Sequence, residues 1–184
     1  MERAWPFVYP RTIQGRLAVL TKTMLEEATK IDFTGEVPGF KAVDRFNQEV
    51  ISLLRKPATR KVLVVVDRGY GLPTGAPHVV RDHLNLTGGN PLVGPNDPGG
   101  QRFPAVNDIY ISLSGAASAV AAGIKPGVQP TDEELNRIHW LGADFYCYNL
   151  VPTMIVAAHA GWKVLAVAVP EGADAAGFIQ SVVS

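Results

Sequence analysis

The stretch "RDHLNLTGGNPLVGPND" (residues 81–97) contains three glycines and two prolines, which keep it from forming a helix. Among them stand two aspartates, one histidine and three asparagines. So many hydrogen-bonding side chains in one segment need partners, because polar groups that fold without partners are costly to bury. The sequence on either side of this segment indicates the structure to which it belongs.

The amino-terminal side predicts two helices and two strands. Apolar residues recur at helical spacing in 15–31 and again in 40–56. The β-branched run "KVLVVV" (61–66) predicts a buried strand that ends in the glycine-rich turn "DRGYG". A second strand is predicted at 77–83.

The carboxyl-terminal side predicts three helices and two strands, besides one segment that the pattern leaves open. Residues 107–123 are rich in small side chains, and the pattern leaves helix and strand both open. A helix is predicted to begin at Thr131, which can cap it ahead of three acidic residues, and to end at Gly142. The other predicted elements are a strand at 143–150, a helix at 151–161, a strand at 162–169 and a helix at 173–183.

Strands that alternate with helices indicate an α/β fold with a mainly parallel or mixed twisted sheet flanked by helices. We expect one domain over residues 1–184, since the length suits a single core. In open α/β sheets, ligands bind outside the carboxyl ends of strands. Here those ends are 66–71, 146–150 and 167–172.

The composition excludes several classes of function. Lys+Arg and Asp+Glu are both 17, so nothing favours nucleic acid or an anionic membrane as partner. Only 18% of the residues are charged, against a usual quarter, which predicts a homo-oligomer that hides part of its surface. The longest apolar run, near 155–169, is interrupted and too short for a membrane span.

Cys147 is the only cysteine, which rules out an internal disulfide and a cysteine-based zinc site. The amino terminus has no apolar core of a secretory signal, so we expect a cytoplasmic protein. His139 and His159 fall on predicted helices without partners at ligand spacing. The sequence therefore predicts neither a metal nor a cofactor.

Residues 81–110 resemble the signature of the trimeric purine nucleoside phosphorylases. The match runs in register over Asp82, His83, Asn85, Leu86, Asn90, Pro91, Leu92, Gly94, Pro95, Asn96, Arg102, Phe103, Pro104, Asp108 and Tyr110. So many matches in order are far more specific than a lone glycine pattern. The resemblance covers residues 61–170 and leaves 1–60 as a divergent helical part.

The resemblance implies a phosphorylase-like fold, a trimer or a multiple of it, and an ordered loop near the subunit contacts for the opening stretch. Its Asn and Asp side chains would then bond backbone groups that a Gly- and Pro-rich loop leaves unpaired. His83 and the three asparagines are structural by this interpretation.

The departures from the family fall on its chemistry. The family's glycine-rich phosphate loop and its Arg-x-His pair have no counterpart here, and we expect its carboxyl-terminal helix to be truncated away. A serine and a ribose-packing Met of the family align with Asn149 and Tyr148, and its purine-binding Glu and Asn align with Pro130 and Gly172. Three or four lost charged hydrogen bonds remove on the order of 6 kcal/mol, or roughly ten-thousandfold in rate. Ordinary phosphorolysis is therefore not expected.

New polar residues stand at the three strand ends instead. We predict Asp67, Glu171 and Tyr148 as catalytic residues, with a carboxylate as general base. The predicted ligand-binding residues are Arg68, Tyr70, Gln129, Tyr146 and Asn149. Tyr146 and Tyr148 share one strand face, while Cys147 points to the other and is expected in the core.

Two functions remain open. The first is an enzyme that binds a nucleoside-like or other flat heterocyclic molecule and hydrolyses or rearranges it, for instance in a biosynthetic pathway. The second is a non-catalytic, phosphorylase-like partner subunit, or a protein with residual nucleoside phosphorylase or hydrolase activity. A ligand-sized pocket faced by a carboxylate would favour the enzyme, and a filled pocket would favour the partner subunit.

Overall fold

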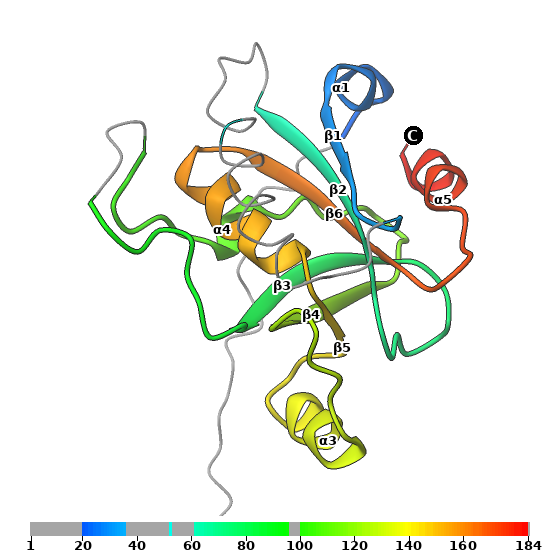
Figure 1. Ribbon diagram of the computed structural model, residues 1–184. Coiled ribbons are helices and arrows are strands. Elements are labelled where there is room, and N and C mark those ends of the chain that lie inside the picture. The colour runs from blue at the N-terminus through cyan, green and yellow to red at the C-terminus, as the bar shows by residue number, and fades with distance from the viewer. Residues whose placement is uncertain (1–19, 36–51, 53–60, 96–99, 184) are drawn as a thin grey trace, which may run out of the picture.

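The structure is a computed structural model that describes residues 20–35, 52, 61–95 and 100–183. Within them lies a six-stranded sheet in the order β1–β2–β6–β3–β4–β5 (Figure 1). The strands are β1 (Thr29–Asp32), β2 (Val62–Arg68), β3 (His78–Leu86), β4 (Ser118–Ile124), β5 (Phe145–Cys147) and β6 (Lys163–Val169). The helices are α1 (Lys22–Glu27), α3 (Asp132–Trp140), α4 (Leu150–His159) and α5 (Ala175–Val182), with a 3-10 turn η1 (Asn107–Ile109).

The sheet consists of two parallel halves that meet antiparallel. β1, β2 and β6 run parallel to one another, and so do β3, β4 and β5. β3 pairs antiparallel with β6 through His78 and Val79. A single antiparallel bridge between Tyr70 and Tyr146 then joins the end of β2 to β5, so the curved sheet closes on itself. The predicted fold class, a mixed α/β sheet flanked by helices, is confirmed.

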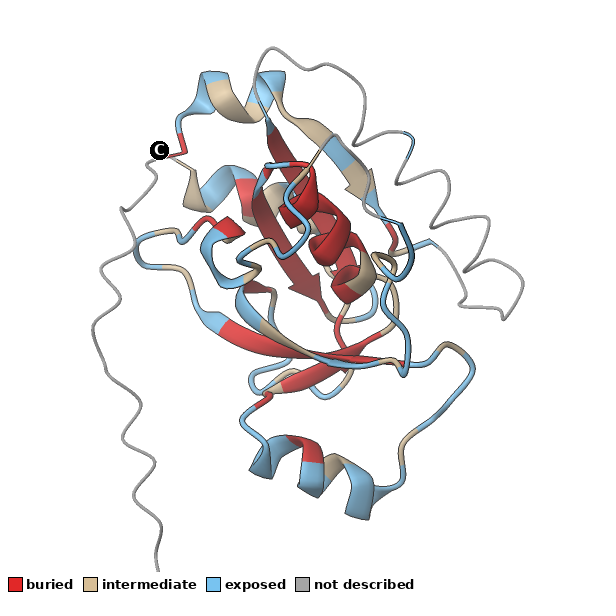
Figure 2. Cartoon of the chain, turned by 90° about the vertical axis from the view of Figure 1, so that its left-hand side faces the viewer, coloured by how far each residue is buried: buried red, intermediate tan, exposed pale blue. Residues whose placement is uncertain are grey.

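The core lies on both faces of the sheet. Leu63 and Val65 of β2 pack with Met154 of α4 on one face, whereas Val64 packs with Ile179 of α5 on the other. The strand is buried on both sides, which is why it reads as a continuous apolar run. Figure 2 shows α4 as a buried helix against the sheet, and Figure 1 shows α1 and α5 together at the other side of β2 and β6.

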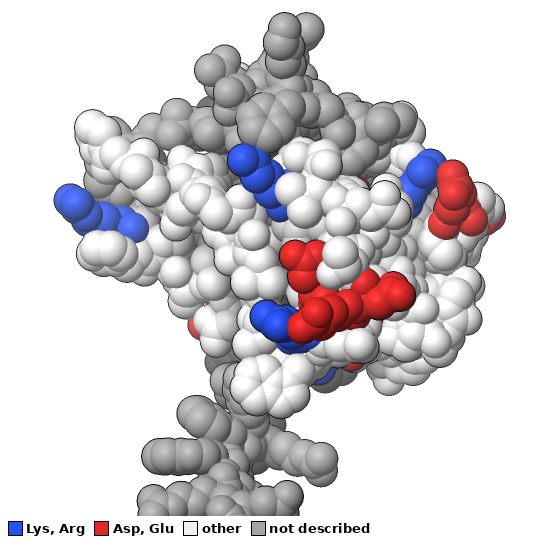
Figure 3. All heavy atoms as spheres, turned by 60° about the horizontal axis from the view of Figure 1, so that its bottom comes forward, with Lys and Arg blue, Asp and Glu red and all other residues white. Residues whose placement is uncertain are grey.

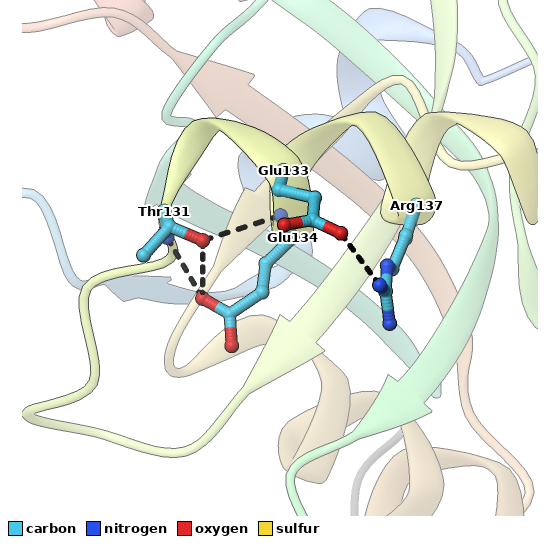
Figure 4. A network of polar contacts seen from close by, with 4 residues as sticks. All are labelled: Thr131, Glu133, Glu134 and Arg137. Atoms are coloured by element: carbon cyan, nitrogen blue, oxygen red, sulfur yellow. Dashed lines mark hydrogen bonds and ion pairs between the residues drawn. The ribbon is translucent and has the colours of Figure 1, made fainter.

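α3 begins as the sequence predicts. The Thr131 hydroxyl accepts from the Glu134 backbone N–H at 3.3 Å, and the Glu134 carboxylate accepts from the Thr131 backbone N–H at 2.8 Å (Figure 4). This reciprocal pair is a capping box. One turn further on, Arg137 donates to Glu133 at 2.6 Å. The cap fixes where the helix starts without any help from the core.

α3 is nevertheless only thinly packed. Ile138 is its one buried residue, and Trp140 is 86% exposed. Figure 2 shows the helix as mainly exposed, at one end of the molecule. Figure 3 brings that end forward and shows acidic side chains gathered beside basic ones on a face with few other charges. The helix is therefore held by local hydrogen bonds more than by burial.

The amino-terminal part differs from the sequence prediction. The helix expected over 15–31 is wrong beyond Glu27, because β1 begins at Thr29. Ile31 pairs with Val65, so its place in the sheet outweighs the helical spacing of its apolar neighbours. Leu20 is buried and Met24 packs against the same core, as the predicted stripe requires. Residues 15–19, and the helix predicted at 40–56 apart from Ser52, lie outside the described residues.

The opening stretch divides into a strand and a loop. β3 continues to Leu86, so residues 81–86 are not the loop that their neighbours indicated. After it, the Asn85 side chain donates to the Gly89 carbonyl at 2.8 Å and accepts from the Thr87 N–H at 3.2 Å, while the Asn90 side chain accepts from Leu92. The structural role predicted for these asparagines is confirmed, and Asn96 lies outside the described residues.

The structure also shows the outcome of three further predictions. His83 is joined to the Tyr110 hydroxyl at 2.6 Å, and burial lowers the pKa of its imidazole. Residues 107–123, which were open between helix and strand, contain both η1 and the first part of β4. The strand predicted at 143–150 is confirmed but shorter, because α4 already begins at Leu150.

Candidate functional site

Three strand ends meet at one place in the described structure. The Tyr70 N–H donates to the Tyr146 carbonyl at 2.9 Å, and the Tyr146 N–H donates back at 3.1 Å. The Gly69 N–H donates to the Val169 carbonyl at 2.9 Å. The ends of β2, β5 and β6 therefore come together, as the sequence predicted, and the predicted site residues come with them.

Three aromatic rings form the centre of this region, here named the tyrosine cluster: Tyr70, Tyr146 and Tyr148. The ring of Tyr70 stacks on that of Tyr146, with centroids 5.0 Å apart and an interplanar angle of 13°. Tyr148 meets both rings edge-on, at 5.4 Å and 5.9 Å. Tyr146 is buried, and the other two are half-buried. The cluster thus has a packed interior and an accessible outer side.

Tyr148 also ties down the loop between β4 and α3. Its hydroxyl donates to the Val128 carbonyl at 2.9 Å. Burial raises the pKa of Tyr148 to about 12, so the phenol is a proton donor at neutral pH. Gln129, the next residue, is exposed on the same loop. The chemistry available to Tyr148 is hydrogen bonding and stacking.

Asp67, at the end of β2, points at the amino end of α4. One carboxylate oxygen accepts from the backbone N–H groups of Asn149 and Leu150, at 3.0 Å and 2.9 Å. The other accepts from the Arg68 N–H at 2.8 Å and from the Asn149 side-chain amide at 3.3 Å. The carboxylate thus caps a helix that lies more than 80 residues further along the chain.

Burial also changes the pKa of Asp67, which is 2% exposed. It raises the pKa of the carboxyl from 3.8 to about 6, and the donated hydrogen bonds offset only part of that rise. A carboxylate offers about four lone-pair sites, and four N–H groups occupy them here. Asp67 can therefore accept a further proton only by giving up one of its contacts.

Arg68 links this region to two other segments. One guanidinium nitrogen donates to the Glu171 carboxylate at 3.2 Å, and the other donates to the Thr34 carbonyl at 3.0 Å. The Arg68 side chain is 34% exposed and that of Glu171 is 82% exposed. The guanidinium thus bridges the segments that follow β1 and β6, from the last residue of β2.

α3 covers the remaining side of the tyrosine cluster. Leu135 and Ile138 pack in the same hydrophobic group as the three tyrosines, together with β4. The rest of the helix is exposed. Access to the tyrosines from this side depends on how firmly α3 is held.

Six of the eight predicted site residues thus lie together at the strand ends: Asp67, Arg68, Tyr70, Tyr146, Tyr148 and Asn149. Glu171 joins them through Arg68, and Gln129 lies next to the carbonyl that Tyr148 contacts. Their catalytic and ligand-binding roles stay predictions.

A cavity of about 400 Å³ lies elsewhere, at the amino ends of β2 and β6. It is lined by Lys61, Lys163, Asp108, the end of α4 and the segment after residue 100. The strand-end site remains the better candidate for family-like chemistry, because ligands in such sheets bind outside carboxyl ends. Sequence reasoning missed the cavity, whose two lysines stand at the starts of neighbouring strands: Lys61 just before β2 and Lys163 as the first residue of β6.

Cys147 is fully buried among core residues, and burial raises the pKa of its thiol well above the usual range. Within the described part of the chain, no group of His, Cys, Asp and Glu residues could hold a metal ion. None of the described helices has the length and apolarity that crossing a bilayer requires.

Comparison with known proteins gives a consistent answer. No family model matches the chain. Purine nucleoside phosphorylase 1 of Geobacillus stearothermophilus is 28% identical over 174 residues, which is 85% of this chain and 64% of that protein. The Bacillus subtilis (strain 168) protein of the same name is 28% identical over 94% of this chain and 70% of its own length. The mouse purine nucleoside phosphorylase is 34% identical, over a shorter match that covers 56% of this chain and 44% of the mouse protein's length.

Solved structures of purine nucleoside phosphorylases are also similar to this chain. Isoform 2 of the Schistosoma mansoni purine nucleoside phosphorylase, in complex with cytosine and ribose-1-phosphate, superposes with a TM-score of 0.61 at 27% identity, over 70% of this chain and 54% of that one. A schistosoma purine nucleoside phosphorylase with hypoxanthine gives a TM-score of 0.54 at 26% identity, over 59% and 47%. The class is therefore that of mixed α/β proteins of the purine nucleoside phosphorylase type.

The chain is thus similar to purine nucleoside phosphorylases in sequence and in fold, at modest identity and over part of their length. It spans about two thirds of the length of the bacterial relatives and about half that of the structural neighbours.

Proposed function

We propose that this protein binds a flat heterocyclic or nucleoside-like small molecule at the tyrosine cluster, and that its chemistry there is not phosphorolysis. The observation that carries the proposal is the meeting of Tyr70, Tyr146 and Tyr148 at the strand ends. Aromatic rings with an accessible face stack favourably on flat ligands. Structural neighbours are described in complex with hypoxanthine and guanosine, which are flat heterocycles.

The same residues argue against phosphorolysis. A phosphate dianion needs several donors at once, and Arg68, the cation among the predicted site residues, already bonds Glu171 and Thr34. Hydrolysis, or a rearrangement such as a cyclisation in a biosynthetic pathway, does not require a bound phosphate. Asp67 would act as base only after releasing one of its N–H partners, for example if α4 shifts when the ligand binds.

A non-catalytic partner subunit is the second candidate, and a specific observation favours it. All four acceptor sites of Asp67 are taken, and Tyr70 stacks on Tyr146 within the predicted site. Such a subunit would keep the fold for assembly and perform no chemistry. Assembly as a trimer and a cytoplasmic location are part of the proposal: the low share of charged residues and the resemblance to trimeric phosphorylases support the trimer, and the single cysteine supports the cytoplasm.

Thermal unfolding with guanosine, hypoxanthine or inorganic phosphate tests the proposal. We expect the two heterocycles to raise the melting temperature, and Tyr70→Leu to abolish that rise. Phe103→Leu, which changes an 85% exposed aromatic residue outside the tyrosine cluster, should keep it. Phosphate-dependent release of hypoxanthine from inosine would refute the absence of phosphorolysis, and no response to any heterocycle would favour the partner subunit.

A further inference from the structure

The cavity at the amino ends of β2 and β6 belongs to neither the tyrosine cluster nor the strand-end chemistry. Its volume of about 400 Å³ lies within the range of small-molecule sites, which is roughly 300–1,000 Å³. Its walls come from the end of α4, the residues just before the two strands, and η1 with the segment that precedes it. The cavity thus sits between three elements that the fold holds in place.

Two ammonium groups stand at this cavity in fixed positions. Lys61 donates to the Ala160 carbonyl at 2.7 Å, and Lys163 donates to the Asp108 carbonyl. The backbone also ties the two lysines together, since the Lys163 N–H donates to the Lys61 carbonyl at 2.8 Å. An ammonium carries three N–H groups, so one carbonyl contact leaves each lysine the capacity to bind an anion. Both lysines are exposed, which gives a ligand access to them.

Apolar residues form part of the remaining wall, next to the polar side chains of Gln101 and His159. Trp162 is 2% exposed and Ile109 is 5% exposed, and Pro104 lines the same space. The wall formed by Gly100 lies very close to α4, because a Cβ there would come within 2.1 Å of the His159 carbonyl oxygen. A glycine at this position lets the segment pass against the end of the helix and enclose the cavity.

A purely structural role explains only part of this arrangement. A cation beside the last carbonyls of α4 stabilises the helix through its dipole, and Lys61 alone supplies that. A second lysine at the same opening adds positive charge that the helix does not need. The charged side chains that line the cavity, Lys61, Lys163 and Asp108, leave a net excess of one cation, before any contribution from His159.

We propose that this cavity is a second ligand site, which takes a small molecule with an oxyanion group on an apolar body. The oxyanion contacts Lys61 and Lys163, and the apolar body lies toward Pro104 and Trp162. Desolvated apolar walls with a few fixed polar groups are the usual composition of such sites. The inference does not depend on what the tyrosine cluster binds.

Benzoate and phenyl phosphate are suitable probes, because both place an oxyanion on a flat apolar ring. Benzyl alcohol, which has the ring without the anion, is the matched control. At a concentration about ten times Kd, we expect either anion to raise the melting temperature by roughly 3–5 °C. The full-length wild type should respond to both anions and not to benzyl alcohol. No response of the wild type to either anion would overturn the proposal.

Substitutions locate the binding. Lys61→Met and Lys163→Met should abolish the rise, measured against each variant's own unliganded melting temperature. Lys22→Met on α1 changes an exposed lysine outside the cavity, and Arg68→Met removes the cation at the tyrosine cluster, so both should keep the full response. A response lost in Arg68→Met and kept in the two lysine variants would move the ligand to the strand-end site and refute the second site.

Asp108→Asn gives a test that does not weaken the anchoring lysines. Lys163 contacts the backbone carbonyl of residue 108, which the substitution retains. Removing one exposed negative charge should tighten benzoate binding roughly two- to fivefold. Fluorescence of Trp162 should change on titration with benzoate, and Trp140→Phe should leave that change intact, because Trp140 lies on α3 and does not line the cavity. An unchanged affinity in Asp108→Asn would contradict the proposed position of the oxyanion.

Discussion

The ring of Tyr70 lies nearly parallel to the ring of Tyr146, although one residue follows β2 and the other belongs to β5. Their backbones exchange two hydrogen bonds at the same point. One residue pair thus closes the curved sheet and builds the wall of the candidate site. Changes at this contact should therefore affect stability and binding together, whereas changes around it should separate the two.

Tyr148→Phe should loosen the loop between β4 and α3. The variant keeps the ring contacts and loses the hydrogen bond to the Val128 carbonyl, together with the hydroxyl's contact with Tyr146. We expect a loss of about 1 kcal/mol in the free energy of unfolding, measured in urea. Amide exchange of residues 125–130 should become faster. Unchanged exchange there would show that the hydroxyl does not hold the loop.

Asp67→Asn should destabilise the protein at neutral pH, because an amide cannot accept all four N–H groups. One or two donors at the amino end of α4 are then left unpaired, at about 1–3 kcal/mol each. Chemical unfolding at pH 7 measures the loss. Asp32→Asn is a control at the end of β1, where the carboxylate bonds only Thr34 and lies near the surface in the described structure.

The same residue predicts a pH dependence. Burial places the pKa of the folded-state Asp67 at about 6, above its usual 3.8, so the folded protein binds this proton more tightly than the unfolded chain does. Its contribution to stability is fully present below pH 3.8 and is lost as the pH rises through about 6. The wild-type free energy of unfolding, minus that of Asp67→Asn, should fall by up to about 3 kcal/mol over this range and then level off. A difference that rises with pH would contradict the assignment.

Thr131→Ala should release α3 before the rest of the fold unfolds. The substitution removes the side chain that accepts from the Glu134 N–H, at about 1 kcal/mol. Because Ile138 is the only buried residue of α3, the loss should appear as faster amide exchange within 132–140 and a smaller change in global stability. Glu133→Gln removes only the exposed pair with Arg137 and should change the stability by less than about 0.5 kcal/mol.

Gly123→Ala tests the packing of α4 on β4. A Cβ at this position would lie 2.5 Å from the Val151 Cβ, so the helix must shift. Overpacking of this kind costs about 1–3 kcal/mol, which thermal or urea unfolding detects. Gly89→Ala is the matched control, since nothing lies within 4 Å of its added Cβ. Equal stability of the two variants would mean that α4 does not pack as tightly as described.

The sequence predicted the parts of the fold that local chemistry decides. The run at Val62–Val66 and the cap at Thr131 carry their own signals, in apolar continuity and in the spacing of Thr131 and Glu134. Ile31 was misassigned, because its partner in β2 is more than 30 positions away and leaves no local trace. For the same reason, no pattern near Asp67 indicated that it caps α4.

The candidate site was predicted from the resemblance and from strand ends, and its residues do lie together. The contacts that define their chemistry were not predictable, since each one joins distant segments. The Tyr148 hydroxyl meets Val128 and the Arg68 guanidinium meets Glu171 only once the sheet has closed. The cavity was missed because lysines at the start of a strand look like ordinary solvated residues until α4 and η1 are placed around them.

The carboxylate that caps α4 has a consequence for how the molecule assembles. Asp67 precedes Asn149 by 82 positions, so the leading amides of the helix gain this partner only after the two halves of the chain have met. A fragment that begins after residue 68 would carry the helix sequence intact and leave its leading amides to water. Adding back a peptide that contains β2 should then restore helicity, so the two pieces would act as complementing fragments rather than as independent folding units.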